Sequence, residues 1–140
     1  MAMSSEDMIR FVDDLYAASA AGDWAAIEAM LTDDFVAYEA DGLPMAGEYR
    51  GKGGLLELYT KVFGLVDVGG LDLLQTTAGG DHAVTILSIR YADPALAPSE
   101  LCEMFRFRDG LICEIKPFYY DPQTFHAAHR AKLALAQAPA

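Results

Sequence analysis

Residues 99–120 read SELCEMFRFR, then DG, then LICEIKPFYY, and this stretch decides the fold of the chain. The pair Asp109-Gly110 stands between two runs in which apolar and polar residues alternate. Asp-Gly in that position is the strongest short-range signal for a β-hairpin. We therefore expect two antiparallel strands, 99–108 and 111–120, joined by a two-residue turn.

The first of these strands carries one carboxylate on an otherwise apolar face. Side chains alternate between the two faces of a strand, so Glu103 shares its face with Leu101, Phe105 and Phe107. A carboxylate among apolar neighbours is costly to keep charged, and its pKa tends to rise. We interpret this face as the wall of a pocket.

Length, charge and cysteine content limit what the chain can be. Its 140 residues predict a single domain over 1–140, with frayed ends at about 1–5 and 136–140. A net charge of −11 opposes nucleic acid and anionic membranes as partners, because both select clustered Lys and Arg. No run approaches the ~20 apolar residues of a membrane span. Cys102 and Cys113 are expected to be reduced, which fits a cytoplasmic protein.

The remaining elements are expected to precede and follow this hairpin. Helical periodicity predicts helices over 6–21, 24–31, 55–63 and 122–135, and strands are expected over 35–39, 71–77 and 83–91. Residues 32–34 are expected to break the second helix, and 41–54 to form a loop. The order is α-α-β-α-β-β-β-β-α. We predict an α+β fold with a cone-shaped, curved and mostly antiparallel sheet wrapped by the N-terminal helices.

Several short motifs, taken together, resemble the nuclear transport factor two-like superfamily. They are AGDW at 21–24, LTDDFV at 31–36, YRG at 49–51, and FRFRDGLI at 105–112 followed by YYD at 119–121. Among its catalytic members the chain is most similar to ketosteroid isomerases and the SnoaL-like polyketide cyclases. The superfamily also includes hydrolases, dehydratases and non-catalytic binding domains, so the fold alone does not define an activity.

The resemblance assigns roles to particular residues. It implies that Glu39 is the general base, that Glu103 is the protonated acid of an oxyanion hole, and that Tyr59 supports the pocket. By the same alignment Leu15 takes the place of the family's oxyanion tyrosine, and Tyr16 points about 100° away. No metal and no cofactor are implied.

Each carboxylate also has a purely structural interpretation. Glu39 could reach water or Arg50, and Glu103 could pair with Arg90 or with a tyrosine hydroxyl. Arg90 could instead bind an anionic group or point outward. The substrate pocket is expected to comprise Leu15, Tyr59, Phe63, Arg90, Phe105, Phe107 and Tyr119.

Three weaker signals complete the sequence. The glycine-rich residues 50–54 before a helix hint at anion binding but lack the spacing of a P-loop. His126 and His129 lie three residues apart without a third ligand nearby, so a zinc site is not expected. Met104, Phe118 and Tyr120 make the outer sheet face apolar, which predicts a homodimer through the sheet.

The expected function is therefore cofactor-free proton transfer next to a carbonyl group in a small apolar ligand, as in isomerases or cyclases. A non-catalytic binding domain that holds an apolar metabolite is the alternative. A third possibility is a dimerisation module whose cone is filled by Phe63, Phe105, Phe107 and Tyr119.

Overall fold

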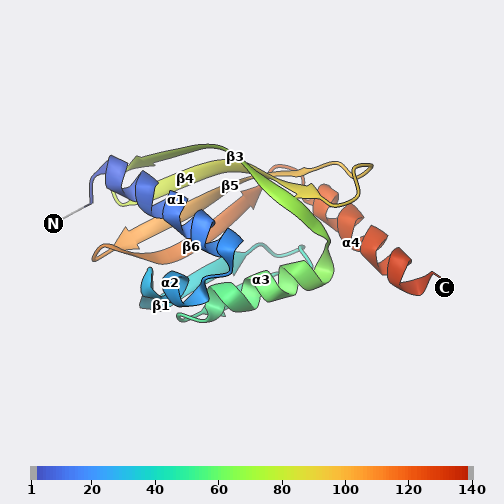
Figure 1. The fold of residues 1–140 in the computed structure, drawn as a ribbon, viewed down its shortest axis with the longest axis horizontal. Coiled ribbons are helices and arrows are strands. Elements are labelled where there is room, and N and C mark those ends of the chain that lie inside the picture. Colours follow the sequence, from blue (N-terminus) through green and yellow to red (C-terminus); the bar gives the residue numbers. More distant parts are fainter. Residues whose placement is uncertain (1–2, 139–140) are drawn as a thin grey trace.

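The computed structural model describes residues 3–138, which form four helices and one six-stranded sheet (Figure 1). The elements are α1 (Ser5–Ala21), α2 (Trp24–Ala29), β1 (Leu31–Glu39), β2 (Gly47–Arg50), α3 (Gly54–Leu65), β3 (Val68–Gly79), β4 (His82–Tyr91), β5 (Ser99–Arg108), β6 (Leu111–Tyr119) and α4 (Pro122–Gln137). The strand order is β2-β1-β6-β5-β4-β3, with β1 and β6 parallel and the other neighbours antiparallel. The expected α+β fold is confirmed.

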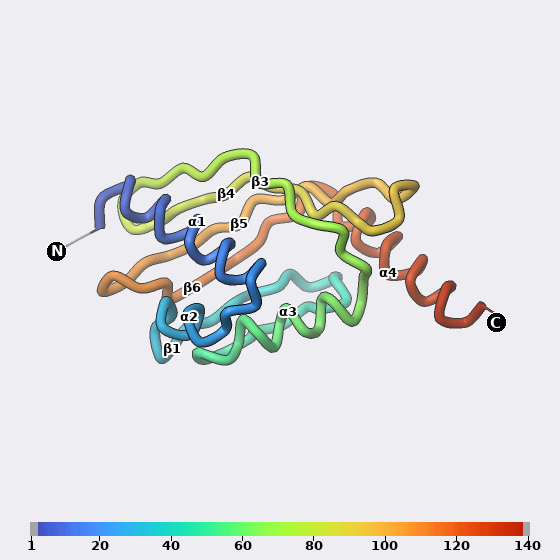
Figure 2. Tube along the Cα trace, in the orientation of Figure 1, coloured from blue at the N-terminus to red at the C-terminus, as the bar shows by residue number. Residues whose placement is uncertain are grey.

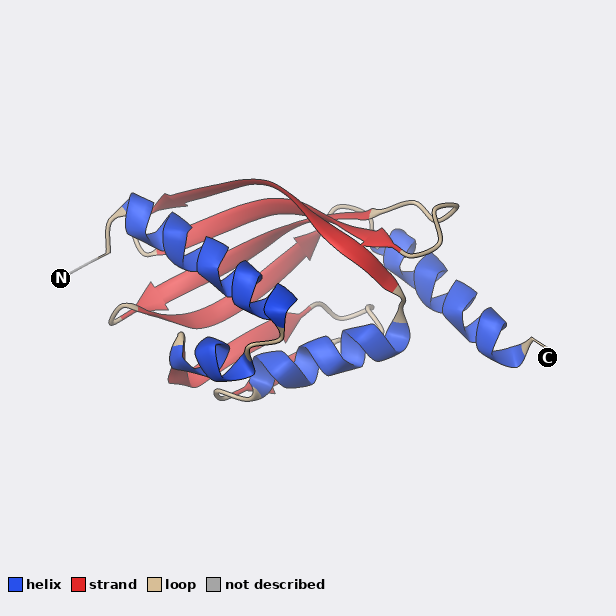
Figure 3. Ribbon diagram, viewed as in Figure 1, coloured by secondary structure: helices blue, strands red, loops and turns tan. Residues whose placement is uncertain are grey.

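The sheet is curved, and the three N-terminal helices lie against one of its faces (Figure 3). The helix α4 follows the end of β6 and projects away from the sheet, so the two termini lie at opposite ends of the molecule. The ends predicted to fray lie partly outside the described residues; α1 begins at Ser5, and α4 continues to Gln137. Within residues 3–138, no helix combines the length and the hydropathy needed to cross a membrane.

Local signals set the boundaries of α1 and of the β5–β6 hairpin. The Ser4 hydroxyl accepts a hydrogen bond from the Asp7 amide at 3.1 Å, and Gly22 ends the helix with φ 68°. In the hairpin, Asp109 and Gly110 both have positive φ, 55° and 78°, as a type I′ turn requires. The predicted hairpin is thus confirmed, and it brings Phe105 opposite Ile115.

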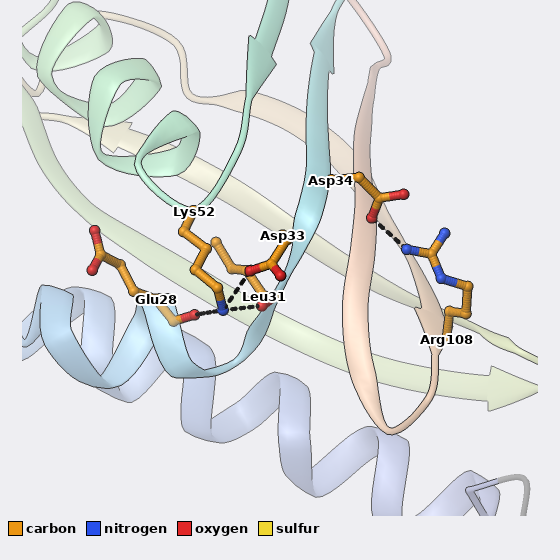
Figure 4. Close-up of polar contacts among 6 residues, drawn as sticks. All are labelled: Glu28, Leu31, Asp33, Asp34, Lys52 and Arg108. Carbon is orange, nitrogen blue, oxygen red and sulfur yellow. Dashed lines mark hydrogen bonds and ion pairs between the residues drawn. The ribbon is translucent and has the colours of Figure 1, made fainter.

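The region between α2 and α3 differs from its prediction. The helix α2 ends at Ala29 and β1 begins at Leu31, so a helix over 24–31 with a break at 32–34 is wrong. The strand starts early because Leu31 is in register with Ile112 of β6. Lys52 donates to the carbonyl oxygens of Glu28 and Leu31 at 3.1 and 2.8 Å and so caps this junction (Figure 4).

Residues 41–54, expected to be a loop, contain the short strand β2. It pairs with β1 from Val36↔Arg50 to Glu39↔Gly47. Tyr49 is buried and its hydroxyl donates to the Met45 carbonyl at 2.7 Å. The start of α3 lies so close to β2 that a Cβ at Gly54 would come within 2.7 Å of the Tyr49 backbone. A glycine is required there, which explains part of the glycine-rich signal.

The core fills the space between the helices and the concave face of the sheet. Its most deeply buried large side chains include Met8, Ile27, Leu31, Phe35, Met45, Leu87, Phe105, Ile112 and Phe125. A chain of hydroxyls fastens α4 to the sheet: Tyr91 contacts Ser99 at 2.5 Å, and Ser99 contacts Thr124 at 2.7 Å. A cavity remains between α3 and the sheet.

Candidate functional site

A cavity of about 100 Å³ lies between α3 and the concave face of the sheet. Fifteen residues line it, and only four of them, Glu39, Tyr59, Glu103 and Tyr119, have polar or ionisable side chains. The lining apolar side chains include Leu55, Leu58, Leu87, Leu101 and Ile115. Two carboxyl groups therefore share one small apolar enclosure, Glu39 from the end of β1 and Glu103 from the middle of β5.

Glu103 is held by a hydrogen bond from Tyr16, whose hydroxyl donates to Oε1 of the carboxyl group. Tyr16 comes from α1 and also packs edge-on against Phe105, with ring centroids 5.9 Å apart. Burial raises the pKa of Glu103, and the hydrogen bond from Tyr16 lowers it in part. Burial and the nearby Glu103 raise the pKa of Tyr16 well above its usual range, so this hydroxyl remains a donor.

The prediction that Tyr16 points away from the pocket is therefore wrong. Leu15, which the resemblance placed at this position, is 2% exposed and packs in the core, not on the cavity. The short motifs fix the register of α1 only to within about one residue. The helix rotates about 100° per residue, so that uncertainty was enough to exchange the two side chains.

Glu39 has no hydrogen-bond donor at its buried oxygen. The side chain is 7% exposed, and among the described residues Oε1 has no hydrogen-bond partner. Burial, with a smaller contribution from Glu103, raises the pKa of Glu39 to about 8. Arg50, its suggested partner, is bound to Glu48 on the surface instead. An unpartnered carboxyl group with this pKa can accept a proton near neutral pH.

Two tyrosines complete the polar lining. Burial raises the pKa of both Tyr59 and Tyr119, and the two carboxylates raise each further. The Tyr59 ring stands edge-on to Trp24, with centroids 5.3 Å apart. Tyr119 packs against Phe125 of α4 at 6.2 Å. Both phenols are therefore neutral donors fixed by aromatic packing.

Of the other residues predicted to line the pocket, one lines the cavity and three do not. Phe63 lines the cavity from α3, whereas Arg90 does not: its side chain is exposed and pairs with Asp72 at 3.3 Å. The prediction that Arg90 lines the pocket is therefore wrong, because its side chain projects from the outer face of β4. Phe105 and Phe107 lie on the predicted face but are core side chains below the cavity.

The weaker sequence signals have structural explanations. Lys52 caps backbone carbonyls, as described above. His126 Nε2 lies 2.6 Å from the Gly42 carbonyl oxygen, and His129 Nδ1 lies 2.9 Å from that of Leu65. Within the described chain no group of three or more His, Cys, Asp or Glu side chains is arranged to hold a metal.

A larger hollow of about 820 Å³ adjoins the cavity and opens to solvent between α1, α3 and the start of β3. We call it the mouth. Four residues line both the mouth and the cavity: Tyr59, Phe63, Val68 and Leu71. Tyr16 and Trp24 line the mouth but not the cavity. A ligand too large for the cavity therefore has room to extend along this side.

The site is thus an apolar cavity lined by two acids and two phenols, in a curved sheet wrapped by helices. The sequence profile of the SnoaL-like domain matches residues 12–115, about three quarters of the chain. The chain belongs to this family, within the nuclear transport factor two-like fold. None of the curated proteins matches the sequence significantly.

Solved structures agree on the fold. A nuclear transport factor two-like protein from Burkholderia xenovorans LB400 is 20% identical, with a TM-score of 0.74 over 91% of this chain and 98% of that one. TerC, co-crystallised with polyporic acid, is 19% identical, with a TM-score of 0.72 over 89% and 98%. A candidate polyketide cyclase from Sinorhizobium meliloti is 19% identical, with a TM-score of 0.66 over 83% and 100%.

Proposed function

We propose that the protein is an enzyme that moves a proton next to the carbonyl group of a small apolar ligand, without a cofactor. The observation that carries this proposal is the pair Glu39 and Glu103 on one apolar cavity, both with raised pKa values. Such perturbed pairs are typical of acid–base sites. The related structures include a candidate polyketide cyclase, which is compatible with this chemistry.

The two acids have different surroundings, and this suggests different roles. Glu39 has no donor at Oε1, so its ionised form is a strong base that would take a proton from the carbon beside the carbonyl. Protonated Glu103 and the Tyr16 hydroxyl would donate hydrogen bonds to the carbonyl oxygen as it becomes an enolate. The enolate would then be reprotonated by Glu39 at another carbon, or attack a second carbonyl group in a cyclisation.

The test is exchange of hydrogen for deuterium next to the carbonyl of cyclic enones and small diketones in D₂O, followed by NMR. We expect Glu39→Gln to slow exchange by about 10²–10⁴-fold. The matched control is Glu100→Gln, on the exposed outer face of the same strand as Glu103. Absence of exchange across the whole panel with the wild-type protein would remove the enzymatic proposal.

A non-catalytic binding domain is the second candidate, and one contact favours it. The Tyr16 hydroxyl already donates to Glu103, so its hydrogen is not free to face a ligand oxygen. If this candidate is right, apolar ketones will raise the melting temperature and yet undergo no exchange. Turnover of any of them would decide in favour of the enzyme.

We also propose that the protein forms a homodimer through the outer face of the sheet. Ile86, Cys102 and Phe118 are consecutive register partners across β4, β5 and β6, so they form an apolar row. Phe118 is 56% exposed and Tyr120 84% exposed. Sedimentation equilibrium tests the proposal: Phe118→Glu should weaken the dimer, and a wild-type monomer at high concentration would refute it. Reduced Cys102 and Cys113 fit the cytoplasmic location that we propose.

A further inference from the structure

The strands β1 and β6 separate before either of them ends. Their parallel pairing includes Val36↔Glu114 and Ala37↔Ile115, and among the described residues it stops there. Nevertheless β1 continues to Glu39, paired with Gly47 of β2, and β6 continues to Tyr119, paired with Leu101 of β5. Figure 2 shows the two tubes running apart in the direction of α4.

Pro117 explains where the sheet divides. Proline has no backbone N–H and cannot donate to a neighbouring strand, so in a sheet it is found at an edge or an irregularity. Pro117 lies two residues after Ile115, the last residue of β6 paired with β1. Two edges therefore face each other in the middle of the sheet, at the position where Glu39 ends β1.

A groove of about 310 Å³ fills this division, and we call it the slot. It is lined by Tyr38, Glu39, Ala40, Asp41, Leu43, Lys116, Pro117, Phe118, Tyr119 and Pro122. Glu39, Pro117 and Tyr119 also line the cavity. The slot and the cavity are thus separated by no more than the thickness of these three side chains.

The two carboxyl groups differ in their relation to the slot. Glu103 lines the cavity but not the slot, whereas Glu39 lines both the cavity and the slot. The mouth is lined by neither of them. A ligand that enters through the mouth therefore meets Tyr16 and Tyr59 first, and Glu39 lies on the side of the cavity that adjoins the slot.

The lining of the slot suits water better than an extended ligand or an ion of one sign. Asp41 and Glu39 are acidic, while the Lys116 ammonium lies 5.1 Å from the centroid of the Tyr38 ring. The mixed signs disfavour both anions and cations. The buried Glu39 Oε1 has no protein partner among the described residues, while the residue as a whole is 7% exposed and lines the slot, so a water that reached Oε1 from the slot would supply the hydrogen bond that it lacks.

We propose that the slot is a second entrance to the cavity, through which water reaches Glu39 while a ligand occupies the mouth. The consequence for catalysis rests on the proposed role of Glu39 as a base. After Glu39 has taken a proton from the ligand carbon, its carboxyl group exchanges that proton for one from a water in the slot, and it then returns the solvent proton to the enolate, which restores the carboxylate. The ligand does not have to leave first.

The titration of Glu39 in the ligand-free protein tests this inference. Its neighbours are Glu103, Tyr49, Tyr59 and Tyr119, each coupled electrostatically to it, with Asp41 and Lys116 at the rim of the slot. The Glu39 side-chain carboxyl carbon would be followed by ¹³C NMR and assigned with Glu39→Gln. This titration does not depend on turnover, so the inference about the slot and the proposed function can be refuted independently of each other.

Two tryptophan substitutions distinguish the entrances. Ala40→Trp fills the slot from an exposed position, and Gly64→Trp fills the mouth at a position where a Cβ meets nothing within 4 Å. We expect Ala40→Trp to raise the pKa of Glu39 by about one unit, because it removes water from the carboxylate, and Gly64→Trp to leave it unchanged. An unchanged pKa in Ala40→Trp, or a rise in Gly64→Trp alone, would overturn the inference.

A labelling experiment decides the matter if Ala40→Trp does not fold. A water-soluble carbodiimide with glycinamide modifies carboxyl groups that solvent reaches, and peptide mass spectrometry locates the products. We expect Glu39 to be labelled and Glu103 to be protected, both in the wild type and in Gly64→Trp. Equal labelling of the two carboxyl groups, or labelling of Glu103 alone, would overturn the inference, because it would show that solvent does not reach Glu39 preferentially from the slot.

Discussion

Replacing Glu39 by Gln should remove a large contribution to the pH dependence of stability. Burial raises the pKa of Glu39 from 4.5 to about 8, and each pKa unit corresponds to 1.36 kcal/mol. The folded state therefore binds more protons than the unfolded state between these values. The contribution of Glu39 to stability is greatest below pH 4.5 and falls as the pH rises towards 8, by about 5 kcal/mol in total, most of it between pH 5 and pH 8.

Urea unfolding at pH 5, 6, 7 and 8 measures this effect. The wild-type protein should lose free energy of unfolding across the series, and Glu39→Gln should lose about 3–4 kcal/mol less. The residual slope reports Glu103, whose pKa is also raised. Glu100→Gln, at an exposed position of β5, is the control and should follow the wild type. Equal slopes for the wild type and Glu39→Gln would refute the burial argument.

Three further substitutions follow from the same contacts. Tyr16→Phe removes a donor that favours ionised Glu103, so the pKa of Glu103 should rise in an NMR titration and turnover should fall about 10²–10³-fold. Tyr120→Phe, at an exposed position outside the slot, the cavity and the mouth, should change neither. Lys52→Met leaves two backbone carbonyls without their donor and should cost about 1–3 kcal/mol in urea unfolding. Leu87→Ala should destabilise by about 2–5 kcal/mol and enlarge the cavity, so that binding of naphthalene, measured by calorimetry, tightens; unchanged binding would place Leu87 away from the ligand.

The features that were predicted correctly depend on short-range chemistry. The turn at Asp109-Gly110 follows from two residues, and the helix cap at Ser4 from four. The features that were missed depend on partners distant in the sequence. Arg90 was assigned to the pocket, but its strand face is set by pairing with β3, where it meets Asp72. The strand β2 exists because β1 offers an edge and Tyr49 packs beneath it.

The two acids that line the cavity could be identified from the sequence, but the contacts around them could not. The apolar strand face identified Glu103 locally, whereas Tyr16 could be assigned only once α1 had been positioned against β5. A one-residue uncertainty in a helix changes which side chain faces a partner. Pro117 was a signal for the slot, since a proline within a strand indicates an interrupted pairing.

Trp24 gives the molecule an optical reporter. It is the only tryptophan of the chain, it lines the mouth, and its indole is held edge-on to Tyr59. A guest that enters between α1 and α3 displaces water beside that ring and alters the polarity that the indole senses. Its fluorescence should thus record the arrival of each guest without any dye, so collections of compounds can be screened on the native chain.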